Sequence, residues 1–237
     1  MYIAEDHEGG NWVQDEEAQR SLILEAMLVE VAFEGWTETA LEAAARASGM
    51  PEKDIQNGVL SILFPKGVRD MFDFWAEIED QRMRENFEAL ETPPTKIREK
   101  ITWLVRNRIE GLTPHREAAR RAAATLALPQ YGTLGTRLAW RTAGAMWQTL
   151  GDPSTDINFY TKRLTLSGVY LSTLARWFAD EAGDDGEAPY APTWAFLDDR
   201  IENVMQFEKV KGRFQKGAPD RQRIAAFLGT LRYCSSA

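Results

Sequence analysis

Arg163 and the rings that precede it form the part of the chain best suited to binding chemistry. Residues 151–163 read Gly-Asp-Pro-Ser-Thr-Asp-Ile-Asn-Phe-Tyr-Thr-Lys-Arg, so the guanidinium follows Phe159 and Tyr160 closely. A guanidinium binds an oxyanion through two parallel hydrogen bonds, and flanking aromatic and aliphatic side chains accommodate a hydrocarbon tail. The segment therefore predicts a site for an anionic head group whose tail lies between helices.

A structural role for Arg163 is the alternative. A buried guanidinium without a partner costs several kcal/mol, and Asp152 and Asp156 are near enough in sequence to pair with it. Asp156 also suits the first turn of a helix, where a carboxylate complements the helix dipole. Both interpretations remain open from the residues alone.

The helix expected from about Asp156 to Asp180 must position Arg163. At 100° per residue it carries two apolar sectors with Arg163 between them, which is typical of a helix at the centre of a core. Neighbouring helices add large apolar side chains, although ordinary packing explains most tryptophans. The candidate lipid-binding residues are Arg163, Phe159, Tyr160, Leu166, Tyr170, Trp103, Met146 and Trp147.

Helical periodicity dominates the rest of the chain, and β-branched alternation never persists, so the fold class is all-α. We expect a helix-turn-helix head over 1–67, a helical lipid-binding and dimerisation body over 68–180, a flexible linker over 181–192 and an amphipathic tail over 193–237. Within the tail, helices are expected near 193–211 and 219–232.

The head begins like the DNA-binding domain of TetR-type regulators. Helices at 38–48 and 52–63 flank a Gly49-Met50-Pro51 turn. The second helix would enter the major groove, yet it opens with Glu52-Lys53-Asp54, a poor start for phosphate contacts. Gln56 and Asn57 still offer base-reading groups. A scaffold that no longer binds DNA is favoured over a ligand-responsive repressor.

The tail predicts a membrane contact. Its first helix carries an apolar stripe, and seven basic and two acidic residues from Gln206 onward give +5, leaving −13 on residues 1–205 of a chain with net charge −8. Docking of this stripe on the body, or on a dimer mate, is the alternative. The candidate membrane-binding residues are Trp194, Leu197, Ile201, Val204 and Met205.

Composition narrows the functional classes. No run of about 18 apolar residues offers a membrane span, and the acidic N-terminus is unlike a signal or transit peptide, so a cytoplasmic location is expected. Cys234 is the one cysteine and His7 and His115 are the two histidines, so we expect no metal site and no cofactor. No Glu-x-x-His pair, phosphate-binding loop or nucleophile elbow occurs, so we expect no catalysis.

The string from about Trp140 to Trp177, continued by Thr193-Trp194-Ala195-Phe196-Leu197, resembles accessory proteins of ubiquinone biosynthesis that bind lipid on a TetR-regulator fold. These proteins form the family numbered nine among the Coq proteins, and this chain resembles a bacterial-type member of that family. The likeness covers about residues 20–210 more loosely. It implies binding of an isoprenoid quinone intermediate or phospholipid on the inner face of the membrane, a homodimer, and presentation of substrate to the demethoxyubiquinone hydroxylase.

In this family, an arginine at the end of a Tyr-Thr-basic-Arg sequence contacts phospholipid. The resemblance implies the same role for Arg163, which ends the sequence Tyr160-Thr161-Lys162-Arg163. Phe159 stands where relatives often have Trp, so the ring is kept and its N–H donor is lost. The same resemblance implies partner contacts through Trp147, Asp156, Phe159 and Tyr160.

Overall fold

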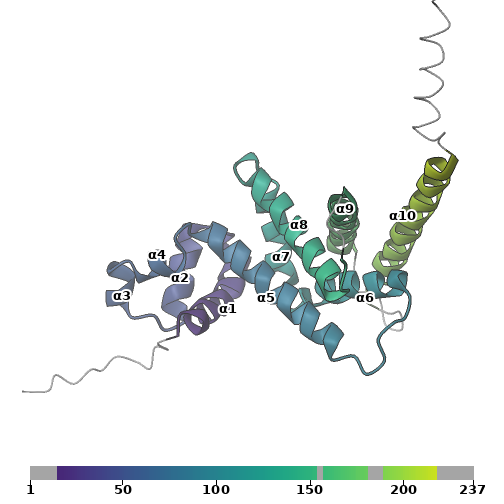
Figure 1. The fold of residues 1–237 in the computed structure, drawn as a ribbon. Helices are drawn as coiled ribbons and strands as arrows, with labels where there is room; N and C mark the ends of the chain where they lie inside the picture. Colours follow the sequence, from purple (N-terminus) through teal and green to yellow (C-terminus); the bar gives the residue numbers. More distant parts are fainter. Residues whose placement is uncertain (1–14, 154–156, 181–188, 218–237) are drawn as a thin grey trace, which may run out of the picture.

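A computed structural model describes residues 15–153, 157–180 and 189–217. Within these ranges the regular elements are helices, with no strand, so the all-α prediction is confirmed (Figure 1). The likeness to TetR-type regulators and the domain boundaries stay predictions. The α-helices are α1 (Glu16–Glu34), α2 (Glu38–Ala47), α3 (Glu52–Gln56), α4 (Val59–Leu63), α5 (Val68–Glu88), α6 (Ile97–Glu110), α7 (Arg116–Leu126), α8 (Gly132–Thr149), α9 (Ile157–Ala179) and α10 (Ala191–Gly217).

Helices α1 to α4 gather at one end of the molecule. Asp15 caps α1 by accepting a hydrogen bond from the Glu17 amide, and Thr37 caps α2 by accepting one from the Ala40 amide. The single helix expected over 52–63 is instead two short helices. Gly58 separates them with a left-handed φ of 80°, a conformation that glycine adopts without steric cost.

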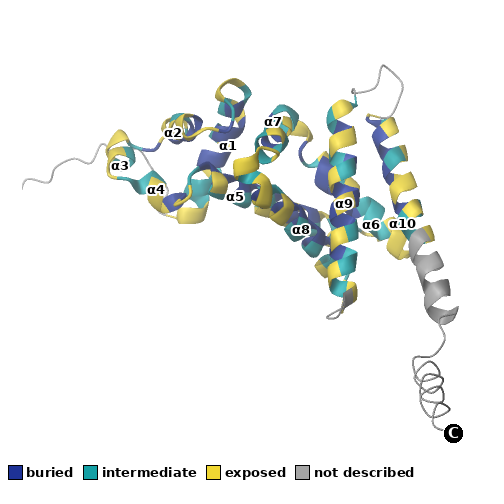
Figure 2. Ribbon diagram, turned by 90° about the horizontal axis from the view of Figure 1, so that it is seen from above, coloured by how far each residue is buried: buried dark blue, intermediate teal, exposed yellow. Residues whose placement is uncertain are grey.

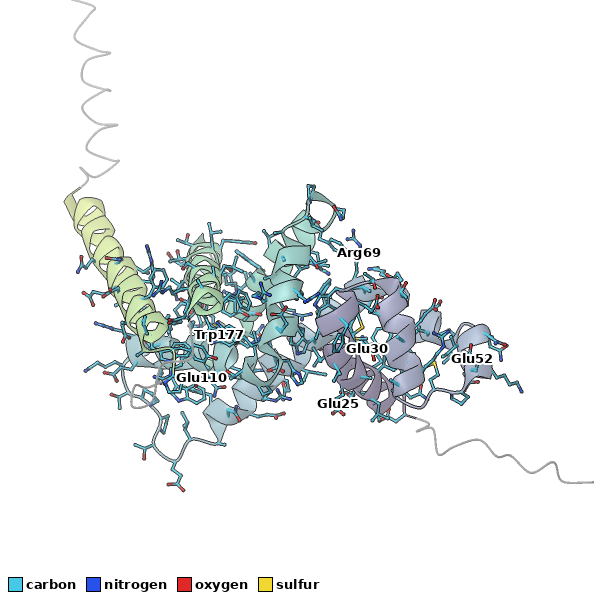
Figure 3. All side chains as sticks on the ribbon, turned by 180° about the vertical axis from the view of Figure 1, so that it is seen from behind. Glu25, Glu30, Glu52, Arg69, Glu110 and Trp177 are labelled. Carbon is cyan, nitrogen blue, oxygen red and sulfur yellow. The ribbon has the colours of Figure 1, made fainter. Side chains whose placement is uncertain are left out.

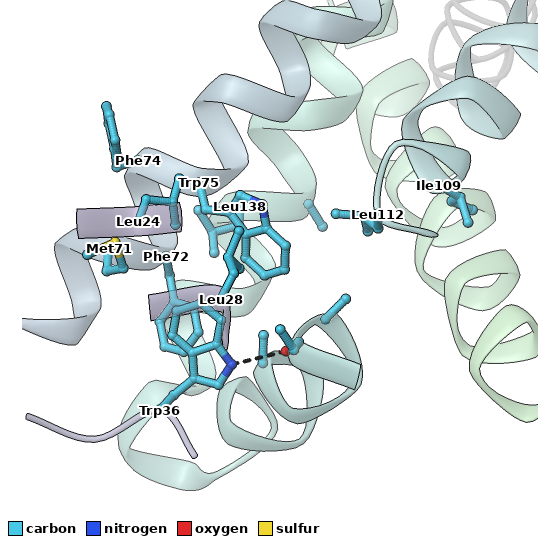
Figure 4. Packing of buried hydrophobic residues seen from close by; sticks show 14 of the residues in the cluster. Leu24, Leu28, Trp36, Met71, Phe72, Phe74, Trp75, Ile109, Leu112 and Leu138 are labelled. Atoms are coloured by element: carbon cyan, nitrogen blue, oxygen red, sulfur yellow. Dashed lines mark hydrogen bonds between the residues drawn. The ribbon is translucent and has the colours of Figure 1, made fainter. Parts of the chain in front are cut away.

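Helix α5 runs from this head into the body, as Figure 1 shows. Trp36, just after α1, packs on the α5 rings of Phe72 and Trp75 with centroid distances of 4.6 and 5.5 Å. Its indole Nε1 donates a buried hydrogen bond of 3.0 Å to the Ala118 carbonyl of α7 (Figure 4). Trp36 therefore joins the head to two helices of the body.

Replacing Trp36 with Phe is expected to lower the stability of the whole chain modestly. The ring stacking largely survives, but the N–H to Ala118 is lost, and a hydrogen bond of this kind contributes about 0.5–1.5 kcal/mol. Denaturant unfolding measures the difference. Unchanged stability would show that this bond does not help to hold the head on the body.

The body consists of α5 to α9, with α10 at the end farthest from α1–α4. Helices α9 and α10 lie side by side in both Figure 1 and Figure 2, and α10 also contacts α6. Labelled side chains in Figure 3 mark the two ends, with Glu52 on the head and Glu110 and Trp177 on the body. Of the described helices, none is both long enough and apolar enough to cross a membrane.

The junction between α9 and α10 is tied by side chains. Asp180 accepts hydrogen bonds from the Thr193 amide and hydroxyl at 3.0 and 2.7 Å. Arg116 of α7 donates to the carbonyls of Trp177 and Phe178 at the end of α9, which satisfies groups that the helix leaves unpaired. Helix α10 begins at Ala191, inside the linker expected over 181–192. Residues 181–188 and the helix expected near 219–232 lie outside the described residues.

Candidate ligand-binding site

Arg163 is buried, with a residue exposure of 4%. Its guanidinium carbon lies 3.4 Å from the centroid of the Phe159 ring, and Nη1 donates 3.2 Å to the Phe159 carbonyl. Asp152 is 3.9 Å away, at the limit of an ion pair, and makes a closer contact of 2.6 Å with Lys162. The structure thus places Arg163 beside Asp152, the first of the two carboxylates considered from the sequence. Asp156 lies outside the described residues.

The hollow beside Arg163 is polar. It has a volume of about 310 Å³ and opens between α5, α8 and α9. Glu77, Asp80 and Arg141 share its wall with Phe159 and Arg163. Such a wall suits a polar or charged group, and it offers a hydrocarbon tail much less apolar surface than a second cavity in the body does.

The apolar space lies elsewhere in the body. A cavity of about 430 Å³ opens among α5, α6, α7, α8 and α9. The small side chains of α7 and α8 leave space for this cavity, and aromatic and aliphatic side chains line the rest of its wall. Its lining includes Phe72, Trp75, Leu112, Ala119, Ala122, Leu126, Leu138, Ala139, Tyr170, Leu174 and Phe178.

A buried polar group closes one part of this cavity. Arg108 of α6 is 4% exposed and donates 2.8 Å from Nε to Asp80 of α5, which is 2% exposed. The Thr142 hydroxyl of α8 donates 2.9 Å to the same carboxylate. Arg108 and Thr142 line the cavity, and the Tyr170 ring centroid lies 5.9 Å from the guanidinium carbon.

The electrostatics keep these groups in fixed protonation states. Burial opposes the charged form of Arg108, but Tyr170, Asp80 and Glu79 outweigh it and raise the pKa of the guanidinium. Burial raises the pKa of the Tyr170 phenol, and the Arg108 cation opposes that rise. At neutral pH, Arg108 is therefore a cation and Tyr170 a neutral hydroxyl.

Reasoning from the sequence missed Arg108, Asp80 and Thr142. A signal for Arg108 exists, because it occupies the apolar stripe that Leu104, Val105 and Ile109 mark on α6. A charged residue at such a position must find a partner inside the protein. Its partners come from α5 and α8, so periodicity along one helix does not reveal them.

The predicted lipid-binding residues lie in several places. Tyr170 lines the apolar cavity, whereas Leu166 and Trp147 line a groove of about 200 Å³ beneath α10. Met146 is fully buried, and Trp103 packs edge-on against Phe87 at 5.4 Å. The structure therefore brings one of these residues, Tyr170, to the largely apolar cavity and distributes the others around α9.

The described residues that were expected to contact a partner protein do not form one surface. Tyr160 is 61% exposed and contacts the rings of Trp140 and Phe159. Trp147 lies under Lys162, with 5.1 Å between the ammonium and the ring centroid. Exposed Leu164 and Leu171 extend the surface of Tyr160 along α9.

The predicted membrane-binding stripe is docked on the body in this structure. Trp194, Leu197 and Ile201 are buried, and Val204 and Met205 are half-buried against the same core. Ile101 of α6 and Val169 of α9 line the groove that the stripe covers. This is the docking alternative considered from the sequence, and membrane contact by these five residues requires that α10 leave the groove.

The head offers few groups for DNA. Helix α3 is five residues long, and Glu52 at its start pairs with Arg46 at 3.1 Å. Both side chains are exposed, and Figure 3 shows Glu52 at the outer end of the molecule. The pairing reduces the positive charge available to phosphates, so this geometry does not favour DNA binding, the alternative considered from the sequence. In the described ranges, no three His, Cys, Asp or Glu residues are grouped as metal ligands would be.

Comparison with known proteins identifies a matching family and several similar proteins. Residues 133–208 match the model of the COQ9 family. The chain is 28% identical to the rat protein named "Ubiquinone biosynthesis protein COQ9, mitochondrial" over 81% of its own length and 60% of the relative's. The bovine and human proteins of the same name are each 27% identical over 84% of this chain and 62% of theirs.

The chain spans about three fifths of the length of these relatives. Their names place them in mitochondria, so the expected bacterial type and cytoplasmic location stay predictions. The matched segment contains most of α8, all of α9 and the first part of α10, and so includes Arg163, Tyr170 and the docked stripe. These matches confirm the family resemblance and make the chain a homologue of the COQ9 ubiquinone biosynthesis proteins.

Proposed function

We propose that the protein is a lipid-binding accessory factor of ubiquinone biosynthesis. It binds a polyprenylated quinone intermediate or a phospholipid at the membrane and presents the substrate to the demethoxyubiquinone hydroxylase. It acts by binding and presentation, without catalysing a reaction itself and without a cofactor. The apolar cavity bordered by Arg108 is the observation that carries this proposal.

The cavity suits such a ligand in size and in lining. Its volume of about 430 Å³ lies within the range of ligand sites in proteins. The apolar wall favours hydrocarbon, and the Arg108–Asp80–Thr142 group adds a charged, hydrogen-bonded region to it. A long tail would pass beyond the cavity, whose lining includes exposed Leu171 and Thr136.

The surface of α9 supports the partner part of the proposal. Tyr160, Leu164 and Leu171 are large apolar residues exposed on one helix, which is typical of a surface that another protein covers. We assign this surface to the hydroxylase or to the second chain of a homodimer. The docked α10 stripe and the basic residues that follow it are assigned to the inner face of the membrane.

Filling the cavity is expected to remove the bound ligand. Ala122 of α7 lines the cavity and Ala124 of the same helix is exposed, so Ala122→Phe and Ala124→Phe form a matched pair. Native mass spectrometry of the full chain from its own host should show a lipid-sized adduct on the wild type and on Ala124→Phe. The Ala122→Phe adduct should fall at least about tenfold, since overlap with the ligand removes its site.

Two outcomes would contradict the proposal. Wild-type protein without any adduct, under conditions that preserve known lipid complexes, would remove the lipid-binding role. An adduct equally abundant on both variants would move the ligand out of this cavity. Thermal unfolding of the variants shows separately that each is folded.

A further inference from the structure

Helix α1 carries a second apolar face, opposite the face that packs on the core. Leu22, Val29 and Phe33 are exposed, Val29 by 60% and Phe33 by 81%. Their spacing of seven and four residues places them along one side of the helix. At about 100° per residue this side lies opposite buried Met27 and Val31. A helix that is apolar on two opposite sides is typical of one that a further surface covers.

Carboxylates edge this second face on both sides. At about 100° per residue, Glu25 lies along one edge and Glu30 along the other, and Figure 3 shows both on the head. Neither forms an ion pair with the part of the chain that the structure describes. We call Leu22, Val29 and Phe33 with these two carboxylates the α1 outer face. It favours a partner helix that has one apolar side and cations at its edges.

The exposed apolar surface of α9 differs in charge. Tyr160, Leu164 and Leu171 form it, and the sequence of α9 contains no acidic residue. Its charged side chains are all basic. A basic helix is therefore attracted to the α1 outer face and not to the surface of α9.

The chain itself contains a segment with the required chemistry. Ile224, Phe227, Leu228 and Leu231 have the i, i+3, i+4, i+7 spacing of a helix that docks through one apolar side. On a helix at about 100° per residue, basic residues fall along both edges of that side. These residues are Arg221, Arg223 and Arg232. Residues 219–232 thus complement the α1 outer face in apolar side chains and in charge.

The position of α10 selects a second copy as the source of this segment. Helix α10 lies at the end of the molecule farthest from α1–α4, as Figures 1 and 2 show. One residue separates its end at Gly217 from residue 219. A helix that begins there stays near the end of α10 and away from the head of its own chain. The head of another copy has no such restriction.

We propose that, away from the membrane, residues 219–232 of one copy bind as a helix to the α1 outer face of a second copy. The two apolar sides pack together, and the arginines pair with Glu25 and Glu30. This contact goes beyond the proposed function, because it involves neither the cavity nor a ligand. The contact and the membrane role of the basic residues exclude each other, since both use the same segment.

Cross-linking of the full chain tests the contact, because Cys234 is the one cysteine and lies two residues after Arg232. One copy carries Cys234→Ser with Ala18→Cys or Glu34→Cys, at the two ends of α1, so that either direction of the bound helix is detected. A second copy of different size keeps Cys234. After mixing without vesicles, a short bismaleimide should join the two copies.

Glu52→Cys, on exposed α3 of the same head, replaces the α1 cysteine as the control. Its yield of joined copies should be at least about 10-fold lower, because docking raises the effective concentration of Cys234 beside α1 alone.

Phe33→Asp tests the apolar part of the contact. The side chain is largely exposed, so the substitution leaves the core unchanged. It places a charge against the apolar side of the bound helix and should lower the yield of joined copies about 10-fold or more. Circular dichroism of the variant shows separately that it is folded.

Exchange of charges tests the ion pairs. Replacing Arg221, Arg223 and Arg232 by Glu in the copy that keeps Cys234 should lower the yield, because like charges then face each other. Adding Glu25→Arg and Glu30→Arg to the other copy should restore most of it, a recovery that a purely structural defect does not give.

Three outcomes would overturn the proposal. A yield at both ends of α1 no higher than that of Glu52→Cys would leave the segment to the membrane alone. Linkage within one chain only, when an α1 cysteine and Cys234 are on the same copy, would make the occupant the chain's own tail. A yield that neither Phe33→Asp nor the charge variants change would place the contact elsewhere on the head.

Discussion

Placing a charged residue in the buried apolar face of α10 is expected to abolish binding of the protein to anionic vesicles. Leu197 is fully buried in the stripe, and Ala195 lies exposed on the same helix. In the proposed membrane-bound state, Leu197→Asp places a charge where apolar side chains would enter the bilayer, and each such side chain contributes about 1.5–3 kcal/mol when buried. Vesicle flotation should show the loss for Leu197→Asp and near wild-type binding for Ala195→Asp.

This pair of variants adds the same charge to the same helix, so general electrostatic repulsion affects both equally. Truncation of the chain before Thr193 should match Leu197→Asp, because it removes the stripe and the basic residues after it together. Flotation of the truncated chain at the wild-type level would contradict the role of α10. Equal loss in both Asp variants would point to charge alone and not to the stripe.

Breaking the buried pair of α5 and α6 should produce the largest change in folding stability. Arg108→Met leaves Asp80 buried, with the Thr142 hydroxyl at 2.9 Å and Arg141 at 3.8 Å as its remaining partners. Removing one member of such a pair typically costs about 3–5 kcal/mol. Denaturant unfolding should show this loss in Arg108→Met and a large recovery when Asp80→Asn is added.

The exposed ion pair of Arg120 and Glu117 provides the comparison. Its loss in Arg120→Met should change stability far less than the loss of the buried pair does, because water screens both charges. A cost for Arg108→Met as small as that of Arg120→Met would show that the buried pair does not hold α5 against α6. A double variant as unstable as the single one would show that the loss comes from packing of the Arg108 stem and not from a stranded carboxylate.

Most of the longer helices were predictable from the sequence because their apolar residues recur at helical spacing. The start of α1, for example, follows from Asp15 and the acidic turn after it. The division between α3 and α4 was not foreseen, since it depends on Gly58 adopting a left-handed conformation within an apolar pattern.

The candidate site was predictable only in part. Arg163 was identified from its neighbours in sequence, and the structure does place it against Phe159 and near Asp152. The cavity depends instead on which helices meet, and Arg108, Asp80 and Thr142 come from three separate helices. The positive side chain that the structure places beside the apolar space is Arg108, whereas Arg163, the arginine singled out from the sequence, borders the polar hollow.

The tail illustrates a further limit. An amphipathic stripe predicts that an apolar surface covers it but does not say which one. The groove formed by Ile101, Trp147 and Val169 is that surface in the present structure, and a bilayer remains the proposed alternative. The groove buries Trp194, Leu197 and Ile201, and a bilayer would bury the same residues, so their pattern does not distinguish the two surfaces.

A crystal structure of the full chain with decyl-1,4-benzoquinone tests the central claim most directly. The account predicts ligand density in the apolar cavity among α5, α6, α7, α8 and α9, with the quinone ring toward Arg108. Density confined to the hollow beside Arg163, or helices closed around an empty centre at saturating ligand, would contradict it.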